Sequence, residues 1–290
     1  MHPCIALEKG NMPQNLQQLK KRIKTSQSIA QITKAMEMIA ASKIRKAQGS
    51  VEKHNPYAKK ITYIVQKILT DKDLYEGIEM FTKKKEGKKL VYAISPDRGL
   101  AGGLVVNLLK KMHSYVSKDD YVIAIGKKAV SAAAKYDFNV LASFNMGSSF
   151  PVYENIYPMI KLARQYYVSG EATSIGIVYT RFKNMLVQEA DIMEIFPVKP
   201  DEHFQDTGID YVFEPSAREV LTDIMPYYFE AEFYGALMNA YASEQAARMT
   251  AMKNAKENAD EISASLTNVY NKSRQEKITN EILHLANGQA

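Results

Sequence analysis

The sequence has 290 residues, of which 46% are hydrophobic and 24% charged, and its net charge is +6. This composition is typical of a globular protein and excludes collagen-like, mucin-like and largely disordered chains. The length allows one large domain, or a smaller domain with an extended element. A single cysteine, Cys4, excludes an internal disulfide, a redox pair and a zinc site with several cysteines. Because the sequence has neither an apolar run near the ~18 residues of a membrane helix nor a secretory signal, we expect the chain to stay in the compartment where it is made.

The charges are unevenly placed along the chain. Eleven basic and two acidic residues lie between Gln14 and Lys60, a net charge of +9, whereas residues 189–223 carry −8. The basic segment is either a solvated helix face or a surface for an acidic partner, which could be nucleic acid, an anionic membrane or an acidic protein.

The first predicted element is a long amphipathic helix over residues 14–56, between Pro13 and Pro56. A step of six residues from Ile23 to Ile29 interrupts its apolar stripe and is expected to rotate the stripe locally. The stripe consists of Leu16, Leu19, Ile23, Ile29, Ile32, Met36 and Ile39.

The middle block, residues 57–228, alternates strand and helix patterns. Separate strands connected by helices indicate βαβ units, so the fold class is α/β with a mostly parallel sheet. Residues 185–196 are expected to add one or two strands at a sheet edge, and residues 83–89 a solvated basic loop. The predicted strands are 89–94, 121–125 and 174–179, and the predicted helices 104–116, 127–135 and 156–169.

The last block, residues 229–290, is predicted to be a second long helix with a narrow seam. Neither terminal helix can bury its stripe alone, so we expect the two to pair as a coiled coil. The C-terminal helix is the longer, and its remainder should project or be covered by another protein. The seam consists of Met252, Ala255, Ala259, Ile262, Leu266, Val269 and Ser273.

A glycine-rich turn, Ser95 to Gly103, follows the first strand, where dinucleotide-binding proteins hold the cofactor. Its glycines are spaced G-x-x-G-G rather than G-x-G-x-x-G, which favours tight packing of strand on helix over nucleotide binding. Asp97 and Arg98 in this turn could pair with each other or with a partner. The sequence has no local signature of a catalytic group or metal site, and we expect no cofactor.

Four motifs closely resemble the gamma subunits of F-type ATP synthases: residues 33–43, 97–103, 242–255 and 270–281. The resemblance covers the chain from about residue 15 to its end. It implies an antiparallel coiled-coil shaft inside a ring of three alpha and three beta subunits, and a Rossmann-like domain that contacts the epsilon subunit and the c-ring. It further implies one copy per complex and a rotor that couples ion flow to ATP synthesis without catalysing the reaction itself.

The same resemblance assigns partner contacts with the alpha/beta ring to Lys34, Met36 and Glu37 on the first helix. Packing of Met36 with Ile32 and Ile39 is the alternative for that residue. Four residues of the last helix are implied to contact beta subunits and to couple to the first helix: Arg248, Gln275, Thr279 and Glu281. For Arg248, beside Ser243 and Glu244, the alternative is pairing within its own helix.

Two departures from the family pattern matter. Residues 1–13 precede the usual start and are expected to be a disordered leader or a misassigned start. Cys4 alone cannot form the paired-thiol switch of the chloroplast members, which favours a bacterial protein, peripheral on the cytoplasmic face of the inner membrane. The alternatives are a gamma-like subunit of a specialised F-type ATPase, a basic coiled coil that binds nucleic acid, and a nucleotide-dependent enzyme.

Overall fold

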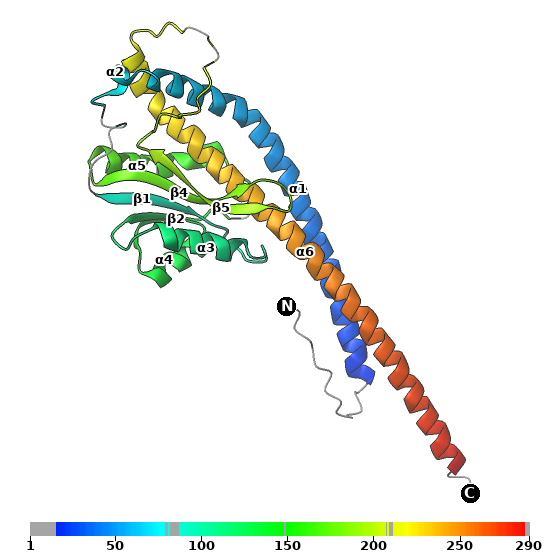
Figure 1. The fold of residues 1–290 in the computed structure, drawn as a ribbon. Helices are drawn as coiled ribbons and strands as arrows, with labels where there is room; N and C mark the ends of the chain where they lie inside the picture. The colour runs from blue at the N-terminus through cyan, green and yellow to red at the C-terminus, as the bar shows by residue number, and fades with distance from the viewer. Residues whose placement is uncertain are drawn as a thin grey trace. The chain divides into compact units, whose positions relative to one another are not determined.

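A computed structural model describes residues 16–78, 81, 87–147, 149–206, 208 and 211–287. The predicted leader, 1–13, and most of the predicted basic loop lie outside these residues. No helix in this part of the chain is long and apolar enough to cross a membrane. The elements are α1 (Leu16–Leu69), α2 (Lys72–Tyr75), β1 (Lys88–Ile94), α3 (Leu104–Tyr115), β2 (Tyr121–Ile125), α4 (Lys127–Tyr136), β3 (Asn139–Phe144), a 3-10 turn (Tyr153–Ile156), α5 (Tyr157–Val168), β4 (Ala172–Phe182), β5 (Gln188–Phe196) and α6 (Ala217–Asn287) (Figure 1).

The chain divides into two compact units, to which α1 and α6 both contribute. The helical unit comprises Met1–Glu37 and Met252–Ala290, and the sheet unit comprises Met38–Ala251. The sheet unit is larger than the predicted domain, 57–228, because the inner stretches of both long helices pack on the sheet.

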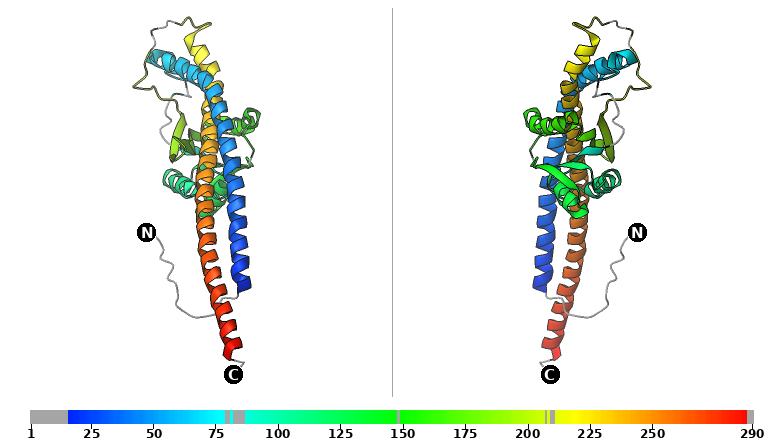
Figure 2. Two further views of the ribbon diagram at one scale, coloured as in Figure 1. Left: turned by 90° about the vertical axis from the view of Figure 1, so that its right-hand side faces the viewer. Right: turned by 90° about the vertical axis from the view of Figure 1, so that its left-hand side faces the viewer.

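In the helical unit, α1 and α6 lie side by side in antiparallel orientation (Figure 2). The seam of α1 is an unbroken heptad pattern, so the predicted interruption after Ile23 is wrong. Ile29 and Ile32 are 47% and 60% exposed. The pattern continues instead through small side chains, with Leu19, Ser26, Ala30 and Thr33 buried and Leu16, Ile23 and Glu37 half-buried.

The seam of α6 also differs from the prediction at two positions. Ile262 and Val269 are exposed, while the residues that follow them, Ser263 and Tyr270, are buried and half-buried. The seam hydroxyls of Ser26 and Thr33 donate to backbone carbonyls, and Ser26 Oγ reaches the Ala259 oxygen across the helices at 2.7 Å. A buried hydroxyl with a partner carries little desolvation penalty, so small polar residues can replace apolar ones where two helices approach closely.

The sheet of the sheet unit has strand order β3-β2-β1-β4-β5. β1 to β4 pair in parallel, and β5 pairs with β4 in antiparallel orientation at the edge. This confirms an α/β fold with a mostly parallel sheet and a strand within 185–196 at its edge. The sequence does not predict β3, the opposite edge strand, which lacks a continuous apolar run because it is only partly buried.

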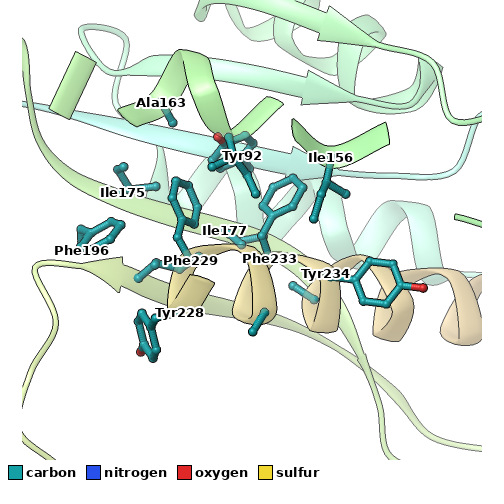
Figure 3. Packing of buried hydrophobic residues seen from close by; sticks show 14 of the residues in the cluster. Tyr92, Ile156, Ala163, Ile175, Ile177, Phe196, Tyr228, Phe229, Phe233 and Tyr234 are labelled. Atoms are coloured by element: carbon teal, nitrogen blue, oxygen red, sulfur yellow. The ribbon is translucent and has the colours of Figure 1, made fainter. Parts of the chain in front are cut away.

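Helices cover both faces of this sheet (Figures 1 and 2). α3 and α4 pack on one face over Val91, Val122 and Val178. On the other face, α5 and the inner stretches of α1 and α6 form the larger core. Its centre is aromatic: Phe229 and Phe233 of α6 meet the Tyr92 ring of β1 edge to face, with centroids 6.3 and 4.7 Å away (Figure 3).

This packing explains why both long helices continue through a proline, Pro56 in α1 and Pro226 in α6. The prediction that α1 ends at Pro56 is wrong, since the helix continues to Leu69 and buries Val65 and Ile68 in the core. α6 likewise begins at Ala217, before Pro226 and well before the predicted residue 229. A proline removes one helical hydrogen bond at a cost of about 3 kcal/mol or more. Burial of several apolar side chains, each contributing roughly 1.5–3 kcal/mol, offsets that cost.

Candidate functional site

Of the predicted contacts of the first helix, Lys34 is exposed, whereas Met36 and Glu37 are half-buried. Lys34 Nζ and Glu37 Oε2 form an ion pair of 3.2 Å, with 50% and 19% of their side chains exposed. Glu37 occupies a seam position and contributes to raising the pKa of Lys256, whose main cause is the hydrogen bond to Asp260. Glu37 therefore faces the partner helix at a seam position, whereas half of the Lys34 side chain is exposed.

Met36 is half-buried beside this pair. The alternative of seam packing with Ile32 and Ile39 does not hold, because those side chains are 60% and 57% exposed. Met36 is thus partly open to contact with a partner, as are the isoleucines.

The predicted C-terminal contacts cluster on the last turns of α6. Gln275, Thr279 and Glu281 are exposed. Their polar contacts are local: Thr279 Oγ1 donates to the Gln275 carbonyl at 3.0 Å, and Glu281 lies 3.7 Å from Lys277 Nζ. Apolar side chains of the same stretch are also exposed, namely Ile278, Ile282, Leu283 and Leu285.

Arg248 belongs to the sheet unit and is largely buried there. Its Nη2 lies 2.7 Å from Glu244 Oε1, with 14% and 15% of the two side chains exposed. The guanidinium also donates to the Gly99 carbonyl at 3.4 Å. Arg248 therefore pairs within α6, as the alternative predicts. The hydrogen bond to Gly99 also connects it to the glycine-rich turn, a contact that the sequence pattern does not predict.

Burial raises the pKa of the Glu244 carboxyl, although the nearby Arg248 guanidinium acts in the opposite direction. From the sequence, Glu244 is only a neighbour of Arg248. Its position four residues before Arg248 was the available signal for an ion pair along one helix.

Asp97 organises the glycine-rich turn rather than pairing with Arg98. Its carboxylate accepts hydrogen bonds from the backbone N–H groups of Lys127, at 2.7 Å, and Gly147. Arg98 is exposed. The turns after β1, β2 and β3 are thereby joined at the carboxyl end of the sheet.

Gly126 shows how tightly these turns pack. Its φ is +89°, and a Cβ there would lie 2.0 Å from the Ser95 carbonyl oxygen. Only glycine fits such a contact at this backbone conformation.

The carboxyl ends of β1 and β4 mark the point where open α/β sheets commonly bind nucleotides. The cavity there has a volume of about 30 Å³, and Leu237, Tyr241 and Glu244 of α6 line it together with Asp97 and Thr180. Such a volume holds about two water molecules. Among the described residues, no three His, Cys, Asp or Glu side chains are grouped to hold a metal ion.

Comparisons with known proteins agree along almost the whole chain. Residues 15–290 match the family model described as ATP synthase. An ATP synthase gamma chain of Dehalococcoides mccartyi is 36% identical over 281 residues, which cover 95% of this chain and 98% of the relative. A gamma chain of Flavobacterium psychrophilum is 37% identical over 284 residues, covering 94% and 97%.

Solved structures show the same fold. A chain in the mitochondrial ATP synthase of Euglena gracilis, in an assembly of OSCP, F1 and c-ring, aligns with a TM-score of 0.65 at 18% identity and covers 94% of this chain and 93% of its own. A chain in a structure of the central stalk and c-ring of the mitochondrial ATP synthase of Tetrahymena thermophila aligns with a TM-score of 0.57 at 21% identity, covering 77% of this chain and 99% of its own. The full-length match to the family model and the gamma-chain relatives lead to one conclusion: this chain belongs to the gamma-chain family of ATP synthases.

Proposed function

We propose that this chain is the non-catalytic rotor of a proton- or sodium-translocating ATP synthase, one copy turning within three alpha and three beta subunits. The observation that carries the proposal is the chemical asymmetry of the helical unit. Its narrow seam buries small side chains and leaves the apolar Ile29 and Ile32 on the surface of α1. Other exposed positions of the same helix carry cations, such as Lys24.

Asymmetry is the property that a rotor needs. A shaft with different chemistry on its different sides cannot contact three equivalent beta subunits identically, so it stabilises a different conformation in each. Rotation then takes every catalytic site through binding, synthesis and release in turn. The rotor supplies coupling free energy between ion flow and nucleotide affinity, and the bond chemistry belongs to the alpha and beta subunits.

In this proposal, the sheet unit makes the contacts with the epsilon subunit and the c-ring. This places the protein at the periphery of the membrane, on the cytoplasmic face of a bacterial inner membrane. The bacterial origin of the gamma-chain relatives supports this assignment.

The test is purification of the full chain through an affinity tag from membranes of its own cells. We expect three alpha and three beta subunits for each copy of the chain, together with epsilon and the c-ring, and ATP-driven ion pumping in reconstituted vesicles. If the tagged chain is purified from the membranes without alpha and beta subunits, that result contradicts the rotor assignment.

A further inference from the structure

The sheet unit contains an apolar pocket between α5 and the first turns of α6, with a volume of about 70 Å³. Its floor is the buried core itself, and Figure 3 shows three of these side chains, Ile175, Phe196 and Phe229. The pocket thus reaches from the surface directly into the aromatic centre of the unit. The other buried side chains of the floor are Ile160, Tyr167 and Met225.

The rim of this pocket combines exposed apolar and cationic side chains. Tyr157 and Val168, at the two ends of α5, are 64% and 58% exposed. Lys161 and Arg164 lie between them, also exposed. Within the described part of the chain, no carboxylate forms an ion pair with either cation.

One acid does line the pocket, but it is engaged elsewhere. Glu230 accepts a hydrogen bond from the Tyr153 hydroxyl through Oε2 at 2.7 Å. The pocket is therefore an apolar cavity beside two cations, Lys161 and Arg164, that form no ion pair with the described residues.

The volume limits what can enter. An apolar cavity of about 150 Å³ holds a benzene molecule, so a pocket of half that size suits one branched aliphatic side chain rather than a lipid tail or a nucleotide. Interface centres in proteins are enriched in Tyr and Arg, and most of the binding energy comes from a few anchors in desolvated pockets.

We propose that this pocket docks another subunit of the ATP synthase complex, through a segment that places a Leu, Ile or Val side chain in the cavity and a neighbouring Asp or Glu against Lys161 and Arg164. The inference rests on the proposed function and names the partner chemistry for one surface of the sheet unit.

The experiment places the photo-crosslinking residue p-benzoylphenylalanine at Val168 of the full chain in the purified complex. The matched control carries it at Val106 of α3, which is 55% exposed and lies on the helix layer of the other sheet face. Irradiation of the Val168 variant should link one other subunit, and the linked peptide should contain an aliphatic residue within four positions of an acid. The Val106 control should not link that peptide.

Charge reversal tests the second half of the proposal. Lys161→Glu with Arg164→Glu should lower the crosslinking yield by about tenfold, equivalent to about 1.4 kcal/mol. The matched pair Lys110→Glu with Lys128→Glu, on exposed lysines of α3 and α4, should leave the yield unchanged. Reversing the acid of the linked peptide to Lys should restore crosslinking of the reversed chain.

The outcomes separate the two proposals. A complex that assembles and pumps, but in which Val168 links nothing, links a second copy of this chain or links a peptide without that chemistry, overturns the pocket assignment alone. An unchanged yield after charge reversal also overturns it. A chain that does not copurify with the complex overturns both the pocket assignment and the rotor function.

Discussion

Ser26 illustrates how a single polar residue can hold a helix interface. Its side chain is 5% exposed, and its hydroxyl reaches the Ala259 carbonyl of the antiparallel helix. Thr33 solves the same problem within α1, donating to the Ile29 carbonyl at 2.9 Å. Because both hydroxyls are small and have partners, they occupy seam positions where a larger side chain would hold the helices apart.

Ser26→Leu should therefore destabilise the full chain more than Ser26→Ala. Overpacking of a well-packed site typically costs about 1–3 kcal/mol, and loss of one neutral hydrogen bond about 0.5–1.5 kcal/mol. The measurement is urea unfolding followed by circular dichroism. Ser28→Ala is the control, because Ser28 is exposed and bonds only to the Lys24 carbonyl in its own helix. Equal stability of the Ser26→Leu and unaltered chains would contradict the observed seam.

Arg248 and Glu244 form an ion pair that is mostly shielded from water. Arg248→Ala leaves the carboxylate without its cation and should cost about 2–3 kcal/mol near neutral pH, less than a fully buried pair because both groups retain some exposure. The same change should raise the pKa of Glu244 further, since it removes the main charge that opposes the effect of burial and leaves only the weaker attraction of Lys43.

The pH dependence follows from that sign. A carboxyl whose pKa is raised in the folded state stabilises the fold at low pH, and this contribution is lost as the pH rises through the folded pKa. The unfolding free energy of Arg248→Ala should fall, relative to the unaltered chain, as the pH rises from about 4.5 through the raised pKa of Glu244. The double variant Glu244→Gln, Arg248→Ala should lack this extra slope when compared with Glu244→Gln. An identical slope in both comparisons would exclude Glu244 as its origin.

At the scale of elements, the most apolar side chains of α1 are not the most buried ones: Ile29 and Ile32 are exposed, whereas Ala30 and Thr33 are buried. Ile29 and Ile32 lie one position away from the seam residues Ala30 and Thr33, which rotates them by about 100° onto a neighbouring face. A pattern of apolar residues identifies an apolar face of a helix. The face that packs against the partner helix is instead the one whose small side chains let the two backbones approach closely. Tertiary packing also decides the course of the long helices at Pro56 and Pro226. There the burial of apolar side chains stabilises the helix by more than the proline destabilises it.

Substitutions on the two faces should differ in how much they change the stability of the chain. Ile32→Gln replaces a 60% exposed side chain and should change the unfolding free energy by less than about 0.5 kcal/mol. Ala30→Met enlarges a buried seam residue and should cost about 1–3 kcal/mol. Thermal unfolding of the full chain measures both, and a larger loss for Ile32→Gln would restore the predicted interrupted stripe.

At the scale of the whole molecule, each unit is built for a different role. The helical unit exposes apolar and cationic side chains on α1 and apolar side chains on the last turns of α6. The sheet unit has the architecture of a nucleotide-binding fold, yet α6 side chains line the crevice where a nucleotide would enter. In the proposed rotor, the first supplies the contacts that differ from one beta subunit to the next, and the second the contacts with the c-ring and epsilon.

Met36→Lys should impair coupling more than assembly. Met36 lies beside Lys34 and is partly open to a partner, so a second cation there would alter contacts with the catalytic subunits without disturbing the seam. ATP hydrolysis by the purified complex should persist, while ion pumping per ATP in vesicles should fall several-fold, equivalent to about 1 kcal/mol of lost coupling.

Val106→Lys is the matched control for that prediction. It replaces an exposed apolar residue with the same cation, but on α3 of the sheet unit. It should leave the pumping ratio unchanged. A Met36→Lys complex that assembles and pumps with the unaltered ratio would remove Met36 from the coupling surface.

The sequence by itself determined the fold class, the pairing of the terminal helices and the family. Periodicity over tens of residues is a strong signal, and buried parallel strands such as 121–125 are apolar throughout. The four motifs carried the resemblance to gamma subunits. The spacing of the glycines in 95–103 does not match a dinucleotide turn, and the absence of a nucleotide there stays a prediction.

Only the tertiary structure decided which residues make the seam, where the long helices end and what Arg248 contacts. Each of these depends on a partner that is distant along the chain: Ala259 for Ser26, the sheet for the helix beyond Pro56, and Gly99 for Arg248. Local propensity and hydrophobicity describe what a segment can do in isolation. The free energy that chooses among those options comes from close packing and from hydrogen-bond partners, which exist only once the chain is folded.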